Sequence, residues 1–264
     1  MTGLQTIARW AAMALLCVAA VPAAAQDTLG KIKERGRLIA GVKFDTPPFG
    51  YLDPSNQPVG FDLDLVRRVA ARLRVPVEFV KVTSPTRIPL LVSGNVDLVA
   101  ASMTRTPERE KVIDFSITYY TGAQSLLVRR DSGIAGLKDI AGKRVAVQQG
   151  TTLEKNLATM VPTATVVGFK DYTSAWLALV QGRADALTGS LDILNGFARE
   201  DSRFVILPDR FSIEPFGIGV RKGDTALREE INGMLRELWG SGQYGELYRK
   251  WFGTDPETAI DVRQ

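Results

Sequence analysis

Two hydroxyl side chains and two arginines lie close together in the segment Thr104-Arg-Thr-Pro-Glu-Arg109. A threonine followed by proline is typical of a helix start, which places Arg109 in the first helical turn. Unpaired backbone N–H groups at a helix start attract anions, and a guanidinium binds a carboxylate or phosphate through two hydrogen bonds. The segment therefore has the residues of an anion clamp, although the same pattern also suits a plain helix cap with a solvated charge pair.

The composition excludes several kinds of catalytic and metal site. The chain of 264 residues has no histidine and a single cysteine, Cys17. A Ser-His-Asp triad, a Cys-His pair and the usual zinc sites are therefore excluded, and we expect no metal and no cofactor. Basic residues are scattered along the chain, so nucleic acid is not an expected partner, whereas small acidic ligands suit the formal net charge of +4.

The N-terminus has the pattern of a secretory signal peptide. Arg9 is followed by an apolar stretch and by an alanine-rich segment that ends at Ala25. This order predicts removal of residues 1–25 and export to the periplasm. A membrane anchor would need about 20 apolar residues, which is more than the stretch provides. A lipoprotein would need a small residue before Cys17, where this chain has Leu16.

The hydrophobic pattern after this segment alternates between strands and helices. Over 62–74 apolar residues share one helical face, with acids at the start and arginines toward the end. Further strands are expected at 37–43, 77–82, 97–101, 125–129, 144–148, 165–168, 184–188, 204–207 and 217–221, and further helices at 86–92, after Asp171, and at 191–199, 224–239 and 241–252. This alternation is typical of parallel α/β proteins, and its repetition after residue 122 suggests a second lobe of similar architecture.

Another helix start is expected at Thr151 and Thr152. Thr151 and Glu154 have the spacing of a capping box. In that motif the threonine hydroxyl and the glutamate carboxylate each accept a hydrogen bond from a backbone N–H of the first turn. We therefore expect the side chain of Thr151 to cap this helix.

Taken together, these segments give the mature chain a resemblance to a known family. The chain resembles the periplasmic substrate-binding proteins of the polar amino-acid class, which supply ATP-driven ABC importers. The resemblance is carried by segments in the family's order: Gly41-Val-Lys43, Pro47-Pro-Phe49, Gly60-Phe-Asp-Leu-Asp64, Gly94-Asn-Val-Asp97, Thr104–Arg109, Asp114-Phe-Ser116, Tyr119-Tyr120, Gly182-Arg-Ala-Asp185, Phe216-Gly-Ile-Gly219, Gly242-x-Tyr244 and Lys250-Trp-Phe-Gly253. Their number and order make the resemblance specific, although no single segment is decisive.

The resemblance implies an α/β protein with the two-lobed, type II periplasmic-binding-protein fold. Lobe 1 would comprise residues 27–118 and 217–264, and lobe 2 residues 124–211. Two hinge crossovers would lie at about 119–123 and 212–216. In this fold the ligand binds in the cleft between the lobes and favours the closed state. The implied partners are a small ligand and an inner-membrane permease, and the protein is expected to be a monomer.

The resemblance also assigns ligand-binding positions. Arg109 matches the arginine that pairs with the ligand α-carboxylate. Ser102 and Thr104 match positions that donate hydrogen bonds to the ligand. Thr151 and Thr152 match the start of a lobe 2 helix whose N–H groups complete the carboxylate site.

Two further cations match positions that hold a second carboxylate in aspartate- and glutamate-binding members. They are Lys43, after Gly-Val, and Arg87, in a Thr-Arg-x-Pro turn. Glutamine and histidine binders tend instead to have an aromatic residue near the position of Pro85. Two extra cations favour an acidic ligand side chain by charge complementarity, unless both are solvated surface residues.

One position departs from the family pattern. Members of the family usually hold the ligand ammonium with an aspartate, and this chain has Ser190 at that position and Asp192 two residues on. A hydroxyl is a weaker partner for an ammonium than a carboxylate is. Either Asp192 or another acid compensates, or the ligand is a carboxylate without a free α-ammonium.

We therefore predict a periplasmic substrate-binding protein that takes a small polar, acidic amino acid, and not an enzyme. One alternative is a binder of a non-amino carboxylate. Another is an enzyme on the same scaffold, similar to cyclohexadienyl dehydratase, which would need a general acid that the sequence does not reveal. A third is a soluble co-receptor of a signalling system.

Overall fold

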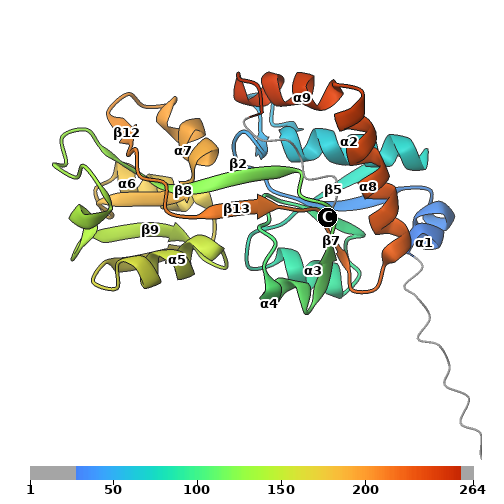
Figure 1. The fold of residues 1–264 in the computed structure, drawn as a ribbon, viewed down its shortest axis with the longest axis horizontal. Coiled ribbons are helices and arrows are strands. Elements are labelled where there is room, and N and C mark those ends of the chain that lie inside the picture. Colours follow the sequence, from blue (N-terminus) through green and yellow to red (C-terminus); the bar gives the residue numbers. More distant parts are fainter. Residues whose placement is uncertain (1–27, 257–264) are drawn as a thin grey trace, which may run out of the picture.

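The computed structural model describes residues 28–256, which form two α/β lobes joined by long strands (Figure 1). The predicted signal peptide, 1–25, lies outside the described residues. Within the described part of the chain, no helix has the length and apolar character needed to cross a membrane.

Lobe 1 is built on a five-stranded sheet in the order β5-β1-β6-β14-β7. Strand β1 pairs in parallel with β5 and with the central strand β6, whereas β14 runs antiparallel to β6 and β7. The strands are β1 (Leu38–Val42), β5 (Val77–Lys81), β6 (Leu98–Ala100), β7 (Ile113–Phe115) and β14 (Gly219–Arg221). The helices are α1 (Thr28–Arg35), α2 (Phe61–Leu73), α3 (Arg87–Val92), α4 (Pro107–Glu110), α8 (Thr225–Gly240) and α9 (Gln243–Phe252).

Lobe 2 has a second sheet in the order β10-β9-β11-β8-β12. Here β9 pairs in parallel with β10 and β11, and β8 runs antiparallel to β11 and β12. The strands are β8 (Tyr120–Arg129), β9 (Arg144–Gln148), β10 (Thr165–Phe169), β11 (Ala186–Ser190) and β12 (Phe204–Ile206). A short 3₁₀ helix (Leu137–Ile140) and the helices α5 (Thr152–Met160), α6 (Tyr172–Val180) and α7 (Leu191–Ala198) complete the lobe.

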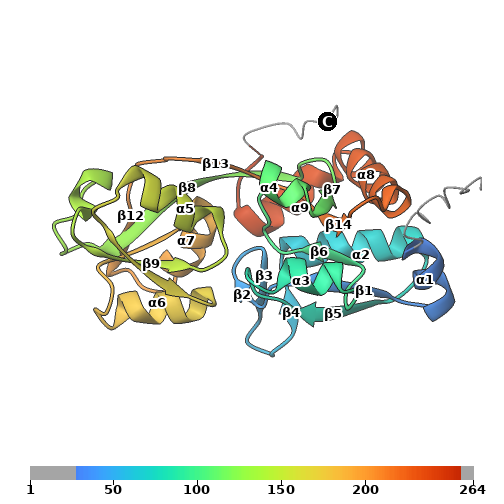
Figure 2. The same cartoon turned by 90° about the horizontal axis from the view of Figure 1, so that it is seen from below.

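Two strands cross between the lobes as an antiparallel pair. β13 (Ile213–Phe216) pairs with the first part of β8, from Ile213 opposite Ala123 to Phe216 opposite Tyr120. Figures 1 and 2 show β8 and β13 running side by side from one lobe to the other. This pair lies in the segments expected to be crossovers, and the lobe boundaries given above stay a prediction.

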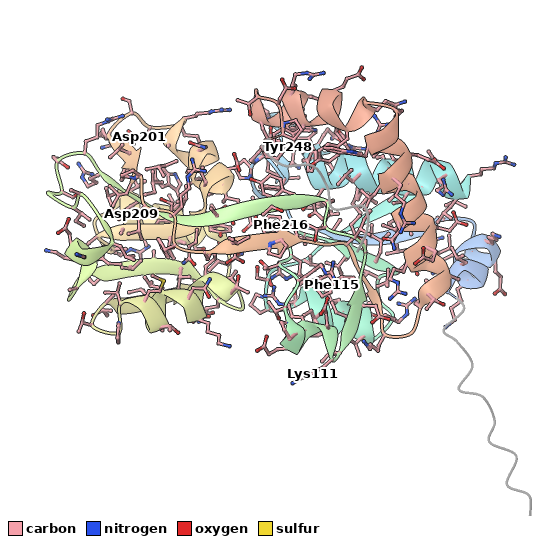
Figure 3. All side chains as sticks on the ribbon, in the orientation of Figure 1. Lys111, Phe115, Asp201, Asp209, Phe216 and Tyr248 are labelled. Carbon is pink, nitrogen blue, oxygen red and sulfur yellow. The ribbon has the colours of Figure 1, made fainter. Side chains whose placement is uncertain are left out.

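An aromatic cluster anchors the crossing strands to lobe 1. Phe216, labelled in Figure 3 where the lobes meet, packs against Phe49, with ring centroids 5.5 Å apart, and against Tyr120 at 5.2 Å. Each of these three side chains is at most 4 % exposed. The ring of Phe49 meets Phe216 edge-on and that of Tyr120 is tilted to it, and such directional contacts fix where the crossing strands enter lobe 1.

The main predicted elements are present, and the differences lie in short segments. The pattern did not predict α1 or the three-stranded sheet of β2 (Asp45–Thr46), β3 (Gly50–Leu52) and β4 (Pro58–Val59). These strands have two or three residues each, which is too short for an alternating pattern to be recognised. They matter for the cleft because β2 begins two residues after Lys43.

Candidate ligand-binding site

The facing ends of the two lobes enclose a narrow cleft lined by buried polar side chains. Its lining residues are Lys43, Ser84, Arg87, Ser102, Thr104, Thr151, Thr152, Leu153, Tyr172, Ser190, Ile193, Glu214 and Phe216. The free space in the cleft is about 10 Å³, which is roughly the minimum for one water molecule. The lobes are therefore closed on each other, and a larger ligand enters only when they separate.

Lys43 and Arg87 form the lobe 1 wall at one end of the cleft. Lys43 follows β1 and Arg87 begins α3, and each side chain is only 2 % exposed. Lys43 Nζ donates a 2.6 Å hydrogen bond to Oε1 of Gln148 in lobe 2. Arg87 Nη1 donates to the carbonyl oxygen of Ala101 at 2.8 Å, while its Nε is buried without a partner among the described residues. The structure thus contradicts the alternative that both are solvated surface cations.

Burial makes these two cations unusually weak bases. Burial lowers the pKa of Lys43 to about 7, although the nearby carboxylate of Asp45 opposes this shift. Burial also lowers the pKa of Arg87 to about 9, and the neighbouring cation of Arg109 adds to this effect. A desolvated cation of this kind is stabilised when an anionic group enters beside it.

Ser102 is held in a strained position after β6. Its φ of +41° lies in the left-handed region, which serine rarely adopts. The backbone N–H of Ser102 donates to Asp62 Oδ2 at 2.7 Å, and the other carboxylate oxygen accepts from the Tyr119 hydroxyl at 2.7 Å. The Ser102 hydroxyl oxygen is buried without a partner in the described chain. Backbone strain and an unpaired buried hydroxyl both cost stability, which is typical of a functional position.

Arg109 lies in the first turn of α4, as the sequence predicted. Thr106 caps this helix, because its hydroxyl accepts a 3.2 Å hydrogen bond from the backbone N–H of Arg109. The Arg109 guanidinium donates to the Thr104 carbonyl at 2.7 Å and, across the cleft, to the Gly150 carbonyl at 3.1 Å. Arg109 does not line the enclosed space itself but lies beside Thr104 at its border. Its side chain therefore connects the two lobes where the cleft opens.

Thr151 and Thr152 begin α5 on the lobe 2 side of the cleft. The Thr152 hydroxyl oxygen lies 3.4 Å from that of Thr104. Thr151 is the N-terminal cap residue, but its hydroxyl donates to the Gln148 carbonyl at 2.7 Å. The predicted capping box is therefore wrong, because the hydroxyl of Thr151 bonds to the end of β9 and no side chain caps the helix.

Ser190 and Asp192 are separated by the crossing strands. Ser190 ends β11 and lines the cleft at 2 % exposure. Asp192 instead accepts a hydrogen bond from the Tyr120 hydroxyl and lines a separate hollow of about 600 Å³. Arg105, which pairs with Glu110 at 2.9 Å, lines the same outer hollow. The structure thus brings Ser190 to the cleft and does not bring Asp192 there.

Glu214 is an acid of the cleft that the sequence did not point out. It lies on β13, and its side chain is buried. Its Oε2 accepts 2.6 Å hydrogen bonds from the hydroxyls of Thr104 in lobe 1 and Thr152 in lobe 2. Its Oε1 accepts from Ser212 at 2.7 Å and from Asn156 at 3.0 Å. The only available signal was a charged residue in an otherwise apolar and proline-containing crossover.

The remaining polar lining residues connect the two lobes. Gln148 Oε1 also accepts from Ser84 at 3.1 Å, and the Tyr172 ring lies 5.1 Å from Lys43 Nζ. The backbone N–H of Tyr172 donates to Asp45 at 2.8 Å. Within residues 28–256, no group of three or more His, Cys, Asp or Glu residues is placed to hold a metal ion. The cleft therefore combines two cationic side chains, one carboxylate and several neutral polar groups.

Comparison with known proteins identifies the same architecture and class. Residues 38–254 match the family described as bacterial extracellular solute-binding proteins, family 3. The ABC transporter glutamine-binding protein GlnH of Bacillus subtilis is 39 % identical over 236 residues, covering 88 % of this chain and 86 % of that protein. The L-glutamate/L-aspartate-binding protein of Pseudomonas aeruginosa is 33 % identical over 254 residues, covering 90 % and 84 %.

Solved structures agree with these relatives. A mutant of ArgBP from T. maritima has a TM-score of 0.83 at 40 % identity, covering 86 % of this chain and all of that one. An ancestral amino acid-binding protein, described as a precursor of cyclohexadienyl dehydratase, has a TM-score of 0.81 at 38 % identity, covering 85 % and 99 %. Family, relatives and fold all correspond to two lobes around an amino-acid site. The chain belongs to the bacterial extracellular solute-binding proteins of family 3, as an amino-acid-binding component of an ABC transporter.

Proposed function

We propose that this protein binds a small dicarboxylic amino acid, of the aspartate or glutamate class, and delivers it in the periplasm to an inner-membrane permease. The observation that carries this proposal is the pair of buried cations, Lys43 and Arg87, at one end of the cleft. Arg87 Nε has no hydrogen-bond partner among residues 28–256, and Lys43 has a pKa lowered to about 7 by burial. A carboxylate at this end would satisfy both side chains at once.

The α-carboxylate would bind at the other end of the cleft. Arg109 already donates to two carbonyl oxygens there, so its guanidinium is aimed at acceptors. Thr104 and Thr152 lie beside it, and Thr152 belongs to the start of α5, whose backbone N–H groups attract anions. Ser102 would add its unpaired hydroxyl between the two ends.

Closure would exchange hydrogen bonds between the lobes for hydrogen bonds to the ligand. Lys43 and Arg109 now donate to Gln148 and to the Gly150 carbonyl on lobe 2. With the lobes apart, both donors become available to the ligand, and closure then brings lobe 2 onto it. The ligand thereby stabilises the closed state through contacts that neither lobe provides alone. We place the movement at the crossovers, at about 119–123 and 212–216, between lobes bounded as given above.

The charge of the cleft distinguishes between the ligands of the relatives. The guanidinium of an arginine ligand would be a third cation beside the desolvated pair of Lys43 and Arg87, which is unfavourable. Glutamine would offer a neutral amide, which accepts weaker hydrogen bonds from cations than a carboxylate does. Aspartate and glutamate match the two cations, as the name of the Pseudomonas relative would suggest.

A reaction on this scaffold is a weaker proposal. A carboxylic acid that lines the cleft is Glu214, which accepts hydrogen bonds from Thr104, Thr152, Ser212 and Asn156. In these contacts both carboxylate oxygens of Glu214 are acceptors, whereas a general acid must donate a proton to its substrate.

The ligand that the protein carries from the cell tests the proposal. The protein is purified without added amino acids and denatured, and the released small molecules are identified by chromatography and mass spectrometry. We expect aspartate or glutamate from the wild type and neither from Arg109→Ala purified in parallel. Release of arginine or glutamine in equimolar amount would overturn the proposed ligand class.

A further inference from the structure

We propose that Glu214 receives the ligand ammonium, in place of the acid that Ser190 lacks, and so makes the cleft select amino acids over plain dicarboxylates. This inference deepens the proposed function and rests on it. It resolves the departure at position 190 with a side chain from the crossing strand β13, which lines the same cleft as Ser190.

The position of Glu214 fits an ammonium next to the α-carboxylate. Its Oε2 accepts from Thr104 and Thr152 at 2.6 Å each, and these two hydroxyls mark the carboxylate end of the cleft. In an α-amino acid the ammonium and the α-carboxylate share one carbon atom. An ammonium acceptor must therefore lie beside the partners of the carboxylate, which is where Glu214 lies.

The other acids near the cleft do not line it among the described residues. Glu214 is the only acidic residue among those that line the cleft. Asp62 is held by the Ser102 backbone and the Tyr119 hydroxyl, and Asp45 accepts from the backbone N–H of Tyr172. Asp192 lines the outer hollow. An ammonium in the cleft would therefore meet one carboxylate, and that carboxylate belongs to Glu214.

The charge balance points the same way. Glu214 is 2 % exposed, and within the described chain no lysine or arginine nitrogen lies within 4.0 Å of its carboxylate. All four of its donors, on Thr104, Thr152, Ser212 and Asn156, are neutral. The Arg109 cation interacts with this carboxylate electrostatically but forms no ion pair with it within 4.0 Å in the described chain. A buried carboxylate is costly, and a ligand ammonium would give it a cationic partner in direct contact.

Glu214 also couples ammonium recognition to closure. It lies on a strand that crosses between the lobes, and its Oε2 joins a hydroxyl of lobe 1 to one of lobe 2. The ammonium would therefore bind at a point that forms completely only when Thr104 and Thr152 approach each other. A plain dicarboxylate would close the cleft without neutralising this carboxylate.

Matched ligands with and without the amino group test the proposal. Calorimetry compares glutamate with glutarate, and aspartate with succinate, on the wild type and on Glu214→Gln. We expect the variant to lose at least about 30-fold in affinity for the amino acids while its affinity for glutarate and succinate is unchanged or higher. Equal losses for both ligands of a pair would show a merely structural role and overturn the proposal.

Three further variants make the result specific. Glu214→Asp keeps the charge and should keep the preference for amino acids. Glu214→Gln combined with Ser190→Asp should regain amino-acid binding, because position 190 lines the same cleft. Asp192→Asn should leave all affinities unchanged, and selective loss of amino acids in this variant would assign the ammonium to Asp192 instead.

Failure of this inference can be told apart from failure of the proposed function. If the wild type binds glutamine or arginine rather than an acidic amino acid, the proposed ligand class fails. Glu214→Gln is then titrated with that amino acid and with its analogue lacking the α-amino group. Selective loss of the amino acid would still support the role of Glu214, and an unchanged preference would contradict it.

Discussion

The ammonium nitrogen of Lys43 donates a 2.6 Å hydrogen bond to Oε1 of Gln148, and so links the end of β1 in lobe 1 to the end of β9 in lobe 2. Both side chains are almost completely buried. The same cation that we assign to the ligand thus holds the cleft closed, and a ligand must replace Gln148 as its partner.

Removing the guanidinium of Arg109 should abolish tight binding. Arg109→Ala deletes a two-nitrogen donor at the carboxylate end, and we expect a loss of at least about 100-fold in affinity, measured by calorimetry. Arg105→Ala is the matched control, because Arg105 pairs with Glu110 and lines the outer hollow. An Arg109→Ala protein that binds as tightly as the control would remove Arg109 from the site.

Removing the ammonium of Lys43 should change which side chain the cleft prefers. Lys43→Met keeps the length and apolar stem of the side chain, and the ratio of glutamate to glutamine affinity should fall by at least about tenfold. Lys111→Met is the control, since Lys111 is exposed and lies at the outer edge of lobe 1 (Figure 3). An unchanged ratio in Lys43→Met would place the acidic end of the ligand elsewhere.

The same substitution should alter how stability depends on pH. Burial lowers the pKa of Lys43 from 10.5 to about 7, so between these values the unfolded chain holds a proton that the folded chain has lost. The contribution of Lys43 to stability is therefore complete above 10.5 and falls as the pH drops toward 7, by up to about 1.4 kcal/mol per pH unit. Urea unfolding without ligand should show that the unfolding free energy of Lys43→Met rises relative to that of the wild type as the pH is lowered from 10.5 toward 7. Parallel profiles for the two proteins would count against a buried, desolvated ammonium.

Relieving the backbone strain at Ser102 should stabilise the folded protein and weaken its binding of the ligand. Ser102→Gly removes a left-handed serine and a buried hydroxyl without a partner among the described residues, and we expect a gain of about 1 kcal/mol in unfolding free energy. Ligand affinity should fall, because the hydroxyl is lost. Ser93→Gly, at an ordinary helical backbone position, should instead destabilise by up to about 1 kcal/mol. Ligand affinity that survives Ser102→Gly unchanged would exclude Ser102 from the site.

Elements with a long periodic pattern could be predicted from the sequence. The helix expected at 62–74 is α2 (Phe61–Leu73), and the strand expected at 144–148 is β9. The helix start before Arg109 was also predictable, because proline after threonine defines it locally. In contrast, the two- and three-residue strands β2 to β4 carry no such signal, since their pairing depends on contacts with one another.

The residues of the candidate site likewise differ in whether the sequence could predict them. Arg109, Lys43 and Arg87 stand in local motifs, and they could be selected from residue type and context. Glu214 could not, because its partners Thr104 and Thr152 are 110 and 62 residues away in the chain. Thr151 shows the opposite case. It has the spacing of a capping box with Glu154, but its hydroxyl donates instead to the carbonyl oxygen of Gln148 in the preceding strand.

Titration of the wild-type protein, freed of any carried-over ligand, with glutamate, aspartate, glutamine and arginine tests the central claim most directly. With Lys43 and Arg87 in the cleft and Arg109 at its border, we predict that glutamate or aspartate binds with a Kd below about 10 μM, at least about tenfold tighter than glutamine and arginine. Tighter binding of glutamine or arginine than of both acidic amino acids would contradict the account.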